Sequence, residues 1–390
     1  MRIAYVNADP GVPPFGTKGC SIHVQEIIRA MLRVGAQVDL FTRRLDGAAP
    51  KSLTHVRVHT LPDAAQSAER ETELLAGNVE LRNQLALGAY DFVYERYSLW
   101  CYAGMEFARA CGLPGVLEVN APLIEEQATY RGLVNRDAVE EVTRRAFSAA
   151  TLLVAVSDEV AAYLQTFPEA RGKIAVIPNA IDPERFPAQL HPSLPAGDGI
   201  FTVGFVGTLR PWHGLSLLAS AFAEFAPQYP QSRLVIVGDG PERELLMAQL
   251  EDFGLRERAV FTGSVSPDRI PSLIASMDVA VAPYPPLDHF YFSPLKVFEY
   301  MAAGRAIVAS RIGQIEKIIE HNDTGWLVAP GDVAALAEAL RTLHDQPDLR
   351  RRLGAQARDC VLGQHTWEQN VRKVLSLVLQ EPAVSAPAKS

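Results

Sequence analysis

The chain has 390 residues, of which 48% are hydrophobic and 21% are charged. This length exceeds that of one ordinary hydrophobic core, so we expect a globular protein with two domains of about 150 to 200 residues. The formal net charge of -8 argues against nucleic acid as the main partner, and an anionic substrate would have to be bound by local donors.

Cysteines and apolar segments narrow the class of protein further. The four cysteines form no CxxC pair and no metal-ligand spacing, which favours free thiols in a reducing cytoplasm. The sequence begins with a strand pattern and not with a secretory segment, and no apolar run reaches the roughly 18 residues that span a bilayer. We expect a cytoplasmic protein, for which peripheral contact with the inner face of the membrane stays open.

The first predicted elements are a buried strand at 2–6 and an amphipathic helix at 22–32, joined by a loop with several glycines and prolines. Gly16 and Gly19 lie in this loop. A strand, a glycine-bearing loop and a helix bring the backbone close to phosphates, although glycine and proline are also the usual residues of plain turns. His23, just inside the helix, is a lone histidine of the kind that is more often structural than catalytic.

Strand and helix patterns alternate along the rest of the first half. The strand patterns lie at 38–42, 56–60, 92–95, 116–119, 152–156 and 174–177, and the helical patterns at 68–89, 99–111, 136–149 and 159–164. This alternation predicts a parallel sheet with helices on both faces. Ligands of such sheets bind beyond the carboxyl ends of the strands, which brings Arg96, Glu118 and Asn120 to the expected site.

The segment VIPNAIDPERFP closes the first half, and proline and glycine remain dense up to residue 199, as in a surface connection. We therefore place an N-terminal domain at 1–182 and a linker at 183–200. A second doubly wound domain is expected at 201–364, a last amphipathic helix at 365–380, and a disordered tail at 381–390.

The second half restarts with an apolar strand at 201–206 and the loop GTLRPWHG. Arg210 offers a rigid fork of donors that suits a phosphate, and His213 can donate too, as a cation over part of the pH range. Each residue alone is more often a surface donor. Their place after a strand and before a helix favours a phosphate site.

A further strand at 234–237 runs into GDGPER, in which Gly238 and Gly240 form half of a dinucleotide fingerprint. Arg243 occupies the place of the third glycine, so a nicotinamide cofactor is not expected. Strand patterns follow at 260–265, 278–283, 306–309 and 324–328, and helical patterns at 333–343, 349–361 and 366–379.

The most informative stretch is DHFYFSPLKVFEYMAAG, residues 288–304. Ser293 is the expected N-cap and Pro294 the expected first residue of a helix that ends at Gly304. Such a helix start presents free backbone N–H groups and a partial positive charge, which suit a phosphate. Glu299 can accept two hydrogen bonds from a vicinal diol such as a ribose. An ordinary buried helix after a loop is the alternative.

This stretch resembles the donor-binding signature of the family 4 glycosyltransferases, which are retaining enzymes of the GT-B fold. The resemblance covers nearly the whole chain in order and is most specific from Gly207 to Gly304. It implies an α/β structure in which two Rossmann-like, doubly wound parallel-sheet domains face a cleft. The C-terminal domain would bind a nucleotide sugar, the N-terminal domain would face the acceptor, and the last helix would cross back to the N-terminal domain.

In this family two glutamates separated by seven residues flank the donor loop. Glu299 corresponds to the ribose-binding glutamate, whereas Tyr291 stands near the place of the sugar-contacting one. The family's basic pair falls on Thr208 and His213, with Arg210 two residues after the first of these. The resemblance implies this set of donor-binding residues: Gly16, Gly19, Gly207, Gly238, Val265, Ser293, Pro294, Leu295, Lys296 and Glu299.

The segment LEVNAPLIEEQ resembles the family's acceptor-side loop, in which many members place a histidine near the reacting sugar. Asn120 stands there in this chain, and asparagine can orient a hydroxyl but cannot act as a base near neutral pH. Glu125 and Glu126 either contact the acceptor or form a solvated charge pair on a loop. Together with His23 and Arg96 they are the acceptor-side candidates.

The resemblance implies a retaining hexosyltransferase-type enzyme of polysaccharide biosynthesis. Its donor would be a UDP- or GDP-linked sugar, and its acceptor a hydroxyl of a saccharide, a lipid-linked saccharide or a small molecule. Because the chain has no Asp-x-Asp motif, we expect neither a metal nor another cofactor. Arg210, His213 and Lys296 would then meet the charge of the departing diphosphate. Arg210, His213 and Asn120 are the catalytic candidates.

Two alternatives stay open. A nucleotide-sugar epimerase of the GT-B fold would convert its substrate without an acceptor. A non-catalytic nucleotide-sugar-binding subunit would bind the donor without turning it over. Tyr291, Asn120 and Thr208 support this second alternative, because each replaces a familiar functional residue of the family.

Overall fold

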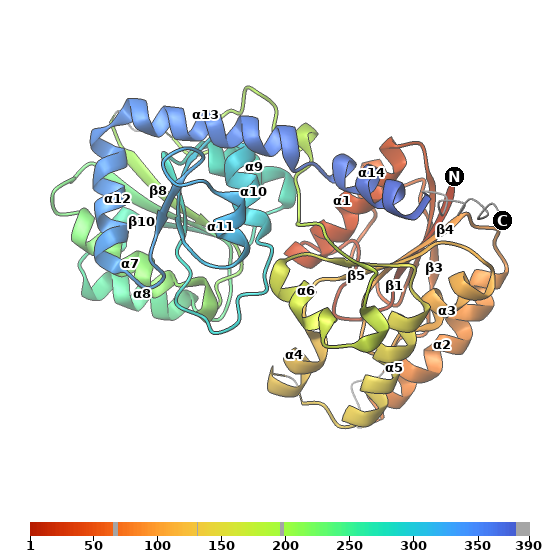
Figure 1. Ribbon diagram of the computed structural model, residues 1–390. Helices are drawn as coiled ribbons and strands as arrows, with labels where there is room; N and C mark the ends of the chain where they lie inside the picture. The colour runs from red at the N-terminus through yellow and green to blue at the C-terminus, as the bar shows by residue number, and fades with distance from the viewer. Residues whose placement is uncertain (65–68, 131, 196–198, 380–390) are drawn as a thin grey trace, which may run out of the picture.

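The computed structural model describes residues 1–64, 69–130, 132–195 and 199–379. The chain forms two lobes that lie side by side, and each lobe is a parallel sheet with helices on both faces (Figure 1). The two doubly wound sheets are those predicted from the alternating strand and helix patterns. The predicted tail at 381–390 and residue 68, the first of one predicted helix, lie outside the described residues.

The N-terminal lobe is built on a seven-stranded parallel sheet with the strand order β3-β2-β1-β4-β5-β6-β7. Its strands are β1 (Arg2–Asn7), β2 (Gln37–Thr42), β3 (Arg57–Thr60), β4 (Phe92–Arg96), β5 (Gly115–Val119), β6 (Leu152–Ala155) and β7 (Ile174–Val176). Its helices are α1 (Gly19–Arg33), α2 (Arg70–Ala86), α3 (Ala103–Ala110), α4 (Leu123–Tyr130), α5 (Arg136–Ala149) and α6 (Asp158–Gln165).

The C-terminal lobe is built on a six-stranded parallel sheet with the order β10-β9-β8-β11-β12-β13. Its strands are β8 (Phe201–Val206), β9 (Ser232–Val237), β10 (Ala259–Gly263), β11 (Val279–Ala282), β12 (Ala306–Ser310) and β13 (Trp326–Val328). The helices that follow β8 are α7 (Leu215–Phe225), α8 (Arg243–Asp252), α9 (Ile270–Ala275), α10 (Leu295–Ala302), α11 (Gln314–Ile318), α12 (Val333–Asp345), α13 (Pro347–Gln364) and α14 (Trp367–Leu379).

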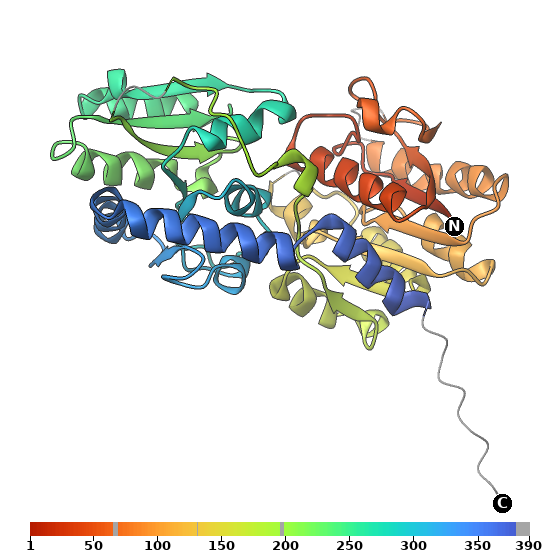
Figure 2. The same ribbon diagram turned by 90° about the horizontal axis from the view of Figure 1, so that it is seen from above.

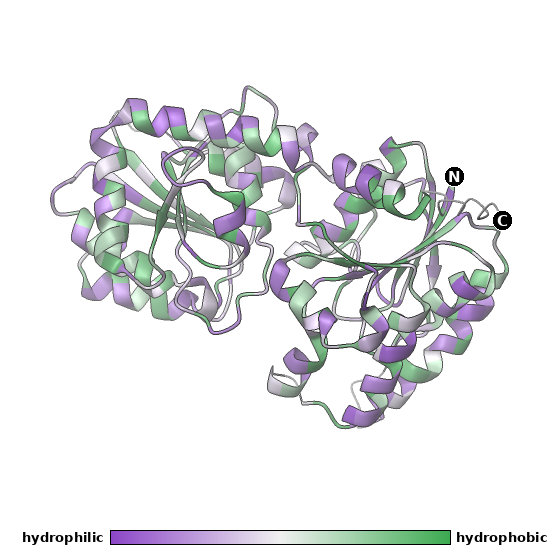
Figure 3. Ribbon diagram, viewed as in Figure 1, coloured by the Kyte–Doolittle hydropathy of each residue, from purple (hydrophilic) through white to green (hydrophobic). Residues whose placement is uncertain are grey.

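The strands form the cores of both lobes. All six residues of β8 are buried, as expected for a strand covered on both faces. Figure 3 shows the same pattern, with hydrophobic strands at the centre and hydrophilic residues on the outer helix faces. Burial therefore explains why these strands read in the sequence as short continuous apolar runs and not as alternating ones.

The strand orders place a crevice in each sheet. β1 lies between β2 and β4, and β8 lies between β9 and β11. The chain leaves the two strands beside this reversal of strand order toward opposite faces of the sheet, which leaves a crevice at their carboxyl ends. Ligands of doubly wound folds bind in this crevice. The loops that follow β1, β4, β8 and β11 are therefore the parts of the chain that form the site.

Several element boundaries differ from those predicted. Residues 123–130 form helix α4, so Glu125 and Glu126 lie on a helix and not on a loop, because Glu, Gln and Ala are strong helix formers. Helix α3 starts only at Ala103. Helix α10 starts at Leu295, one residue later than predicted, because Pro294 is still extended with ψ 107°.

The chain passes between the lobes twice, and the two passages are joined to each other. Ile181 N–H donates to the carbonyl of His365 at 3.0 Å, and Trp367 N–H donates to the carbonyl of Ile181 at 3.1 Å. Beyond this junction α14 packs against α1 of the N-terminal lobe, while α13 runs along the C-terminal lobe (Figure 2). Trp367 is 3% exposed and packs edge-on against His23, with ring centroids 4.9 Å apart.

Replacement of Trp367 by alanine is expected to lower the free energy of unfolding by about 3 to 5 kcal/mol, because it removes a large buried ring and leaves a cavity. Urea unfolding monitored by circular dichroism measures this change. Leu377→Ala is the matched control, since Leu377 lies on the same helix but is 43% exposed. It should cost less than about 1 kcal/mol. Equal losses in the two variants would show that the burial of Trp367 does not stabilise the fold.

Candidate active site in the cleft between the lobes

A cleft of about 430 Å³ opens between the lobes, at the carboxyl ends of β1, β4, β8 and β11. Both lobes contribute side chains to its wall. The N-terminal lobe and the segment that leaves it supply Lys18, Gly19, His23, Arg96, Asn120, Asn179 and Arg185. The C-terminal lobe supplies Gly207, Thr208, His213, Gly238, Asp239, Val265, Tyr284, Ser293, Pro294, Leu295, Lys296 and Glu299.

Lys296 is the buried cation of the cleft. Its side chain comes from the first turn of α10 and is 9% exposed. The ammonium lies 4.1 Å from the ring centroid of Phe205, and it has no hydrogen-bond partner among the described residues. Burial lowers the pKa of Lys296 to about 7. A buried donor without a protein partner at the wall of a cleft is a group that a ligand or an ordered water can satisfy.

Two glycines allow the backbone to come close to this ammonium. Gly207 directly follows β8 with φ +146°, and a Cβ atom at this position would lie 2.9 Å from Lys296 Nζ. Gly238 directly follows β9 with φ +130°, and a Cβ atom there would lie 2.0 Å from the carbonyl oxygen of Gly207. Any other residue would be strained at either position and would crowd this wall of the cleft.

His213 is held as a neutral ring. Its Nδ1 lies 2.6 Å from the carbonyl oxygen of Thr208, so Nδ1 carries the proton and donates it. Burial, together with the nearby charge of Lys296, lowers the pKa of His213 to about 3. The ring therefore lines the cleft without adding a positive charge near neutral pH, in contrast to the cationic role considered for it above.

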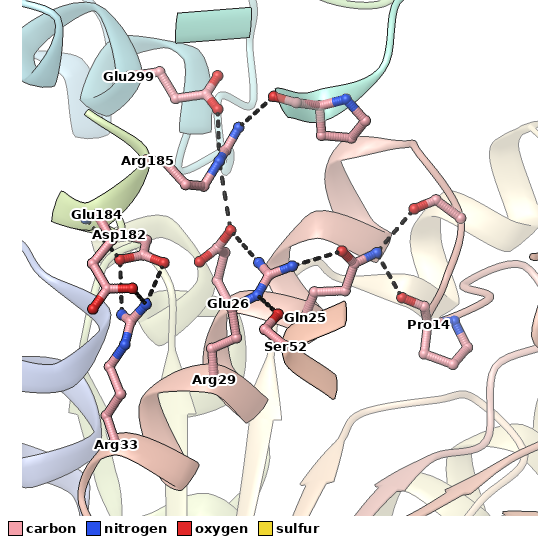
Figure 4. A network of polar contacts seen from close by, with 12 residues as sticks. Pro14, Gln25, Glu26, Arg29, Arg33, Ser52, Asp182, Glu184, Arg185 and Glu299 are labelled. Atoms are coloured by element: carbon pink, nitrogen blue, oxygen red, sulfur yellow. Dashed lines mark hydrogen bonds and ion pairs between the residues drawn. The ribbon is translucent and has the colours of Figure 1, made fainter. Parts of the chain in front are cut away.

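Glu299 lies on α10 about one turn after Lys296 and contacts a residue from outside the C-terminal lobe. Arg185 Nη1 donates to Glu299 Oε1 at 3.2 Å, and the same nitrogen lies 3.5 Å from Glu26 Oε1 on α1 (Figure 4). Burial raises the pKa of Glu299, whereas Arg185 acts to lower it. The contact uses Oε1, so that Oε2 stays available to a ligand.

On the N-terminal side, two amide oxygens lack partners. Asn120 Oδ1 and Asn179 Oδ1 are buried and accept no hydrogen bond from the described residues. Both residues line the cleft. With Lys296 Nζ they form a set of unsatisfied polar atoms on opposite walls, and this set matches a polar ligand that spans the two lobes.

The ring nitrogens of His23 both face protein groups. Arg96 Nη1 lies 3.0 Å from Nδ1, and Glu118 Oε1 lies 2.9 Å from Nε2. Since an arginine can only donate, Nδ1 accepts and Nε2 carries the proton toward Glu118. His23 is 2% exposed. It therefore positions Arg96 at the cleft and is not available as a base.

The loop before α10 ties the two lobes together. Ser293 Oγ accepts from the N–H of Asn179 at 2.9 Å, and the carbonyl of Ser293 accepts from Asn179 Nδ2 at 2.5 Å. The Ser293 hydroxyl therefore does not cap the helix as predicted. The Tyr291 hydroxyl donates to Glu126 of α4, and the carbonyl of Tyr291 accepts from Ser157 at 3.0 Å. Tyr291 thus serves the contact between the lobes.

Four of the predicted site residues are not part of this cleft wall. Gly16 has its carbonyl bound by Gln25 Nε2 at 3.0 Å. Arg210 is exposed, with its guanidinium 5.6 Å from the ring of Trp212. Glu125 forms an exposed ion pair with Arg136, as in the solvated alternative considered for it. Glu126 lines a separate cavity of about 400 Å³ in the N-terminal lobe.

Sequence reasoning missed Asn179 and Arg185, which both lie in the segment VIPNAIDPERFP. This segment looked like a connection between domains because proline punctuates it. The available signal was its mixture of amide, carboxylate and guanidinium groups within a short stretch, since a plain linker has no need of them.

The charges on the cleft wall favour an anion. Its cationic side chains are Lys18, Arg96, Arg185 and Lys296, whereas its carboxylates are Asp239 and Glu299. In the described parts of the chain, no group of three or more His, Cys, Asp or Glu side chains is arranged to hold a metal ion. Among the same residues, no helix has the length and apolar character needed to cross a membrane.

Comparison with known families matches both lobes. A profile described as Glycosyltransferase Family 4 covers residues 17–185, and one described as Glycosyl transferases group 1 covers residues 200–346. The chain is a family 4 glycosyltransferase. The two matches include nearly all of the cleft wall described above, so the family resemblance and the geometry concern the same residues.

This glycosyltransferase is 25% identical over 395 residues to an uncharacterized glycosyltransferase of Methanocaldococcus jannaschii, with 97% of each chain covered. It is 30% identical over 267 residues to the 2-deoxystreptamine glucosyltransferase of Streptomyces kanamyceticus, a match that covers 64% of this chain and 66% of that protein.

Solved structures confirm the predicted GT-B fold. Sucrose-phosphate synthase of Thermosynechococcus elongatus superposes with a TM-score of 0.74 at 22% identity, covering 97% of this chain and 98% of that one. HepE of Anabaena, in complex with UDP and glucose, superposes with a TM-score of 0.71 at 23% identity, covering 96% of this chain and 99% of that one.

Lys296→Met is expected to stabilise the ligand-free glycosyltransferase, and more so at pH 6.5 than at pH 10. With its pKa lowered from 10.5 to about 7, Lys296 binds fewer protons in the folded state than in the unfolded state between these values. The wild type therefore gains stability from this group as the pH rises through that window. Thermal unfolding across this pH range measures the difference.

Lys317→Met serves as the matched control, because Lys317 is an exposed lysine of the same lobe. It should change the free energy of unfolding by no more than about 0.5 kcal/mol at any pH in this range. A stabilisation by Lys296→Met that does not depend on pH would show that the buried ammonium is not the cause.

Proposed function

We propose that this glycosyltransferase transfers a sugar, with retention of the anomeric configuration, from a UDP- or GDP-linked donor to a hydroxyl acceptor. The observation that carries the proposal is the set of unsatisfied polar atoms, above all Lys296 Nζ, on the walls of a cleft between two doubly wound sheets. HepE, which has the same fold, binds UDP and glucose.

The diphosphate of the donor would lie against the start of α10. The first N–H groups of a helix have no intrahelical acceptor and carry a partial positive charge. Ser293, Pro294 and Leu295 bring this helix end to the cleft wall, and Lys296 in its protonated form adds a positive charge beside it. We assign the main phosphate contact to Lys296 and not to Arg210, which lies outside the cleft wall, or to His213, which is neutral.

The ribose of the donor would bind at Glu299. Its carboxylate lies on the same helix as Lys296, one turn further from the helix start, which matches a nucleoside placed beyond its phosphates. Val265 and Pro267, in the loop after β10, line the same end of the cleft. That loop is the natural place for the base.

Only two carboxylates, Asp239 and Glu299, lie on the wall of the cleft in the described part of the chain, and Glu299 is engaged by Arg185. We therefore propose attack by the acceptor hydroxyl on the same face of the sugar from which the phosphate leaves. The bond from the anomeric carbon to the phosphate oxygen breaks while the bond to the acceptor oxygen forms. The acceptor proton passes to the leaving phosphate. Lys296 and the helix start stabilise the charge that develops there, and no metal is required.

The acceptor would enter from the cavity of the N-terminal lobe. Its volume of about 400 Å³ suits a sugar-sized group, and its wall carries Asp9, Ser98 and Glu126 beside Trp100. Glu126 is also the residue that accepts from Tyr291, so the cavity adjoins the contact between the lobes. Asn120 and Arg96 lie on the N-terminal wall of the cleft and would orient the reacting hydroxyl.

A thermal-shift screen against UDP- and GDP-linked sugars tests the donor assignment, since a ligand of the folded state raises the melting temperature. The stabilising donor is then incubated with and without saccharide acceptors, in EDTA and in Mn²⁺. We expect slow donor hydrolysis or transfer that EDTA does not abolish. Conversion of the sugar without release of the nucleotide would instead indicate an epimerase. Binding without turnover would indicate a non-catalytic subunit.

The affinity for UDP, or for GDP if that is the nucleotide bound, is expected to fall as the pH rises above about 7. The diphosphate binds best to the protonated form of Lys296, and in the ligand-free protein this proton is lost at a pKa of about 7. Above this pH, binding must be accompanied by proton uptake, so the dissociation constant should rise by up to tenfold per pH unit. The nucleotide's own terminal phosphate titrates near pH 6 and does not contribute. Isothermal titration between pH 6.5 and 9 measures this dependence.

Two variants separate the candidate cations in the same titrations. Lys296→Met should weaken binding about tenfold or more at pH 7, because it removes a charge-assisted contact, and should flatten the pH dependence. Arg210→Ala should leave the affinity within about threefold and the pH dependence intact. The reverse result would assign the phosphate to Arg210 and contradict the role proposed for Lys296.

A further inference from the structure

We infer that Arg185 is a positioning residue for donor recognition. Although it lies in the segment that connects the lobes, it fixes the Glu299 carboxylate against the ribose of the nucleotide. This inference rests on the proposed function, in which Glu299 binds the ribose. It assigns a role in donor binding to a residue outside the nucleotide-binding lobe.

The first argument is the number of elements that one guanidinium joins. Arg185 Nη1 donates to Glu299 Oε1 at 3.2 Å and lies 3.5 Å from Glu26 Oε1. Its Nη2 donates to the carbonyl of Pro267 at 3.0 Å. The three partners belong to α10, to α1 and to the loop after β10. The two terminal nitrogens of the planar guanidinium reach all three partners at the same time. A lysine has a single nitrogen and would not lie within hydrogen-bond distance of all three.

The second argument is that the backbone of Arg185 is fixed from both lobes. Asp182 accepts two hydrogen bonds of 2.7 Å from Arg33 of α1, one on each carboxylate oxygen (Figure 4). The next residue, Phe186, is 1% exposed and packs in the core of the C-terminal lobe. Its carbonyl accepts from Arg358 at 2.7 Å. The Arg185 side chain therefore starts from a defined place and cannot follow Glu299 if that carboxylate moves.

The third argument is the state of the Glu299 carboxylate. Its side chain is only 15% exposed, and a carboxylate in such a place needs a nearby cation to stay ionised. Glu26 is the competing carboxylate: it is 2% exposed, burial raises its pKa to about 7, and Arg29 donates to it at 2.7 Å. Because Glu26 already has its own arginine, Arg185 remains free to orient Glu299 with Oε2 open to a ribose hydroxyl.

The experiment measures how well the protein distinguishes a nucleotide that has the ribose diol from one that lacks it. Isothermal titration gives the dissociation constants of UDP and of 2′,3′-dideoxy-UDP for the wild type and for Arg185→Gln. The guanine pair of nucleotides replaces the uracil pair if the protein binds GDP. We expect the wild type to bind UDP at least tenfold more tightly than the dideoxy nucleotide. Arg185→Gln should lose most of this preference, because it weakens the binding of UDP and leaves that of the dideoxy nucleotide unchanged.

Arg33→Gln is the matched control. It removes an arginine that joins α1 to the same turn, through Asp182 and Glu184, but that does not contact Glu299 in the described structure. It removes one of the two anchors of the Arg185 backbone but leaves the bonds of Arg185 to Glu299 and Pro267 in place. It should therefore keep most of the wild-type preference for UDP, even if it lowers the melting temperature. Should Arg185→Gln fail to fold, Arg185→Lys retains the charge and gives the same test, with a smaller expected loss of preference.

The outcomes separate this inference from the function on which it rests. A wild type that binds UDP and the dideoxy nucleotide equally well, or binds neither UDP nor GDP, would overturn the ribose site itself. A wild type that prefers UDP, together with an Arg185→Gln variant that keeps the full preference, would overturn only the role of Arg185. Equal weakening of both nucleotides would show that Arg185 supports the fold and does not position Glu299.

Discussion

The structure depends on one constraint of parallel sheets, which is that all strands of a sheet end at the same edge. Each sheet reverses its strand order beside its first strand, and the two sheets face each other at this edge. The loops that follow their strands therefore meet in one cleft. No single loop needs a strong motif for this to happen. Glycines at 207 and 238 let the backbone approach, while Lys296 and Glu299 project from one helix that begins there.

The charge on the cleft wall is opposite in sign to the net charge of the protein. The protein carries a net charge of -8, yet the wall of the cleft holds four cationic side chains and two carboxylates. The most buried of these cations, Lys296, has aromatic rings for neighbours in place of a hydrogen-bonded counter-ion. A buried ammonium in such surroundings destabilises the ligand-free fold, and this cost is reasonable only if an anion is the normal occupant.

The sequence predicted the parts of this site that depend on local chemistry. The strands were predictable because burial on both faces makes them short apolar runs, and Glu299 and Lys296 because their helix start has a recognisable pattern. The sequence did not reveal that Tyr291 would turn to Glu126 or that His213 would be neutral, because both depend on neighbours distant in the chain. Arg185 was missed for the same reason. Its partners Pro267, Glu299 and Glu26 lie 82, 114 and 159 residues away from it in the sequence.

The position of Tyr291 suggests how a family carboxylate can be replaced without loss of the site. A sugar-contacting glutamate at this place would face the donor, whereas Tyr291 packs toward the N-terminal lobe and bonds to Glu126. The loop before α10 is therefore held by the opposite lobe through Tyr291 and Ser293. In the proposed function, contacts to the sugar would then come from backbone groups of that loop and from Asn120 and Asn179, whose buried amide oxygens lack partners among the described residues. Acceptors of this kind select hydroxyl positions by hydrogen-bond geometry and add no negative charge beside the departing diphosphate.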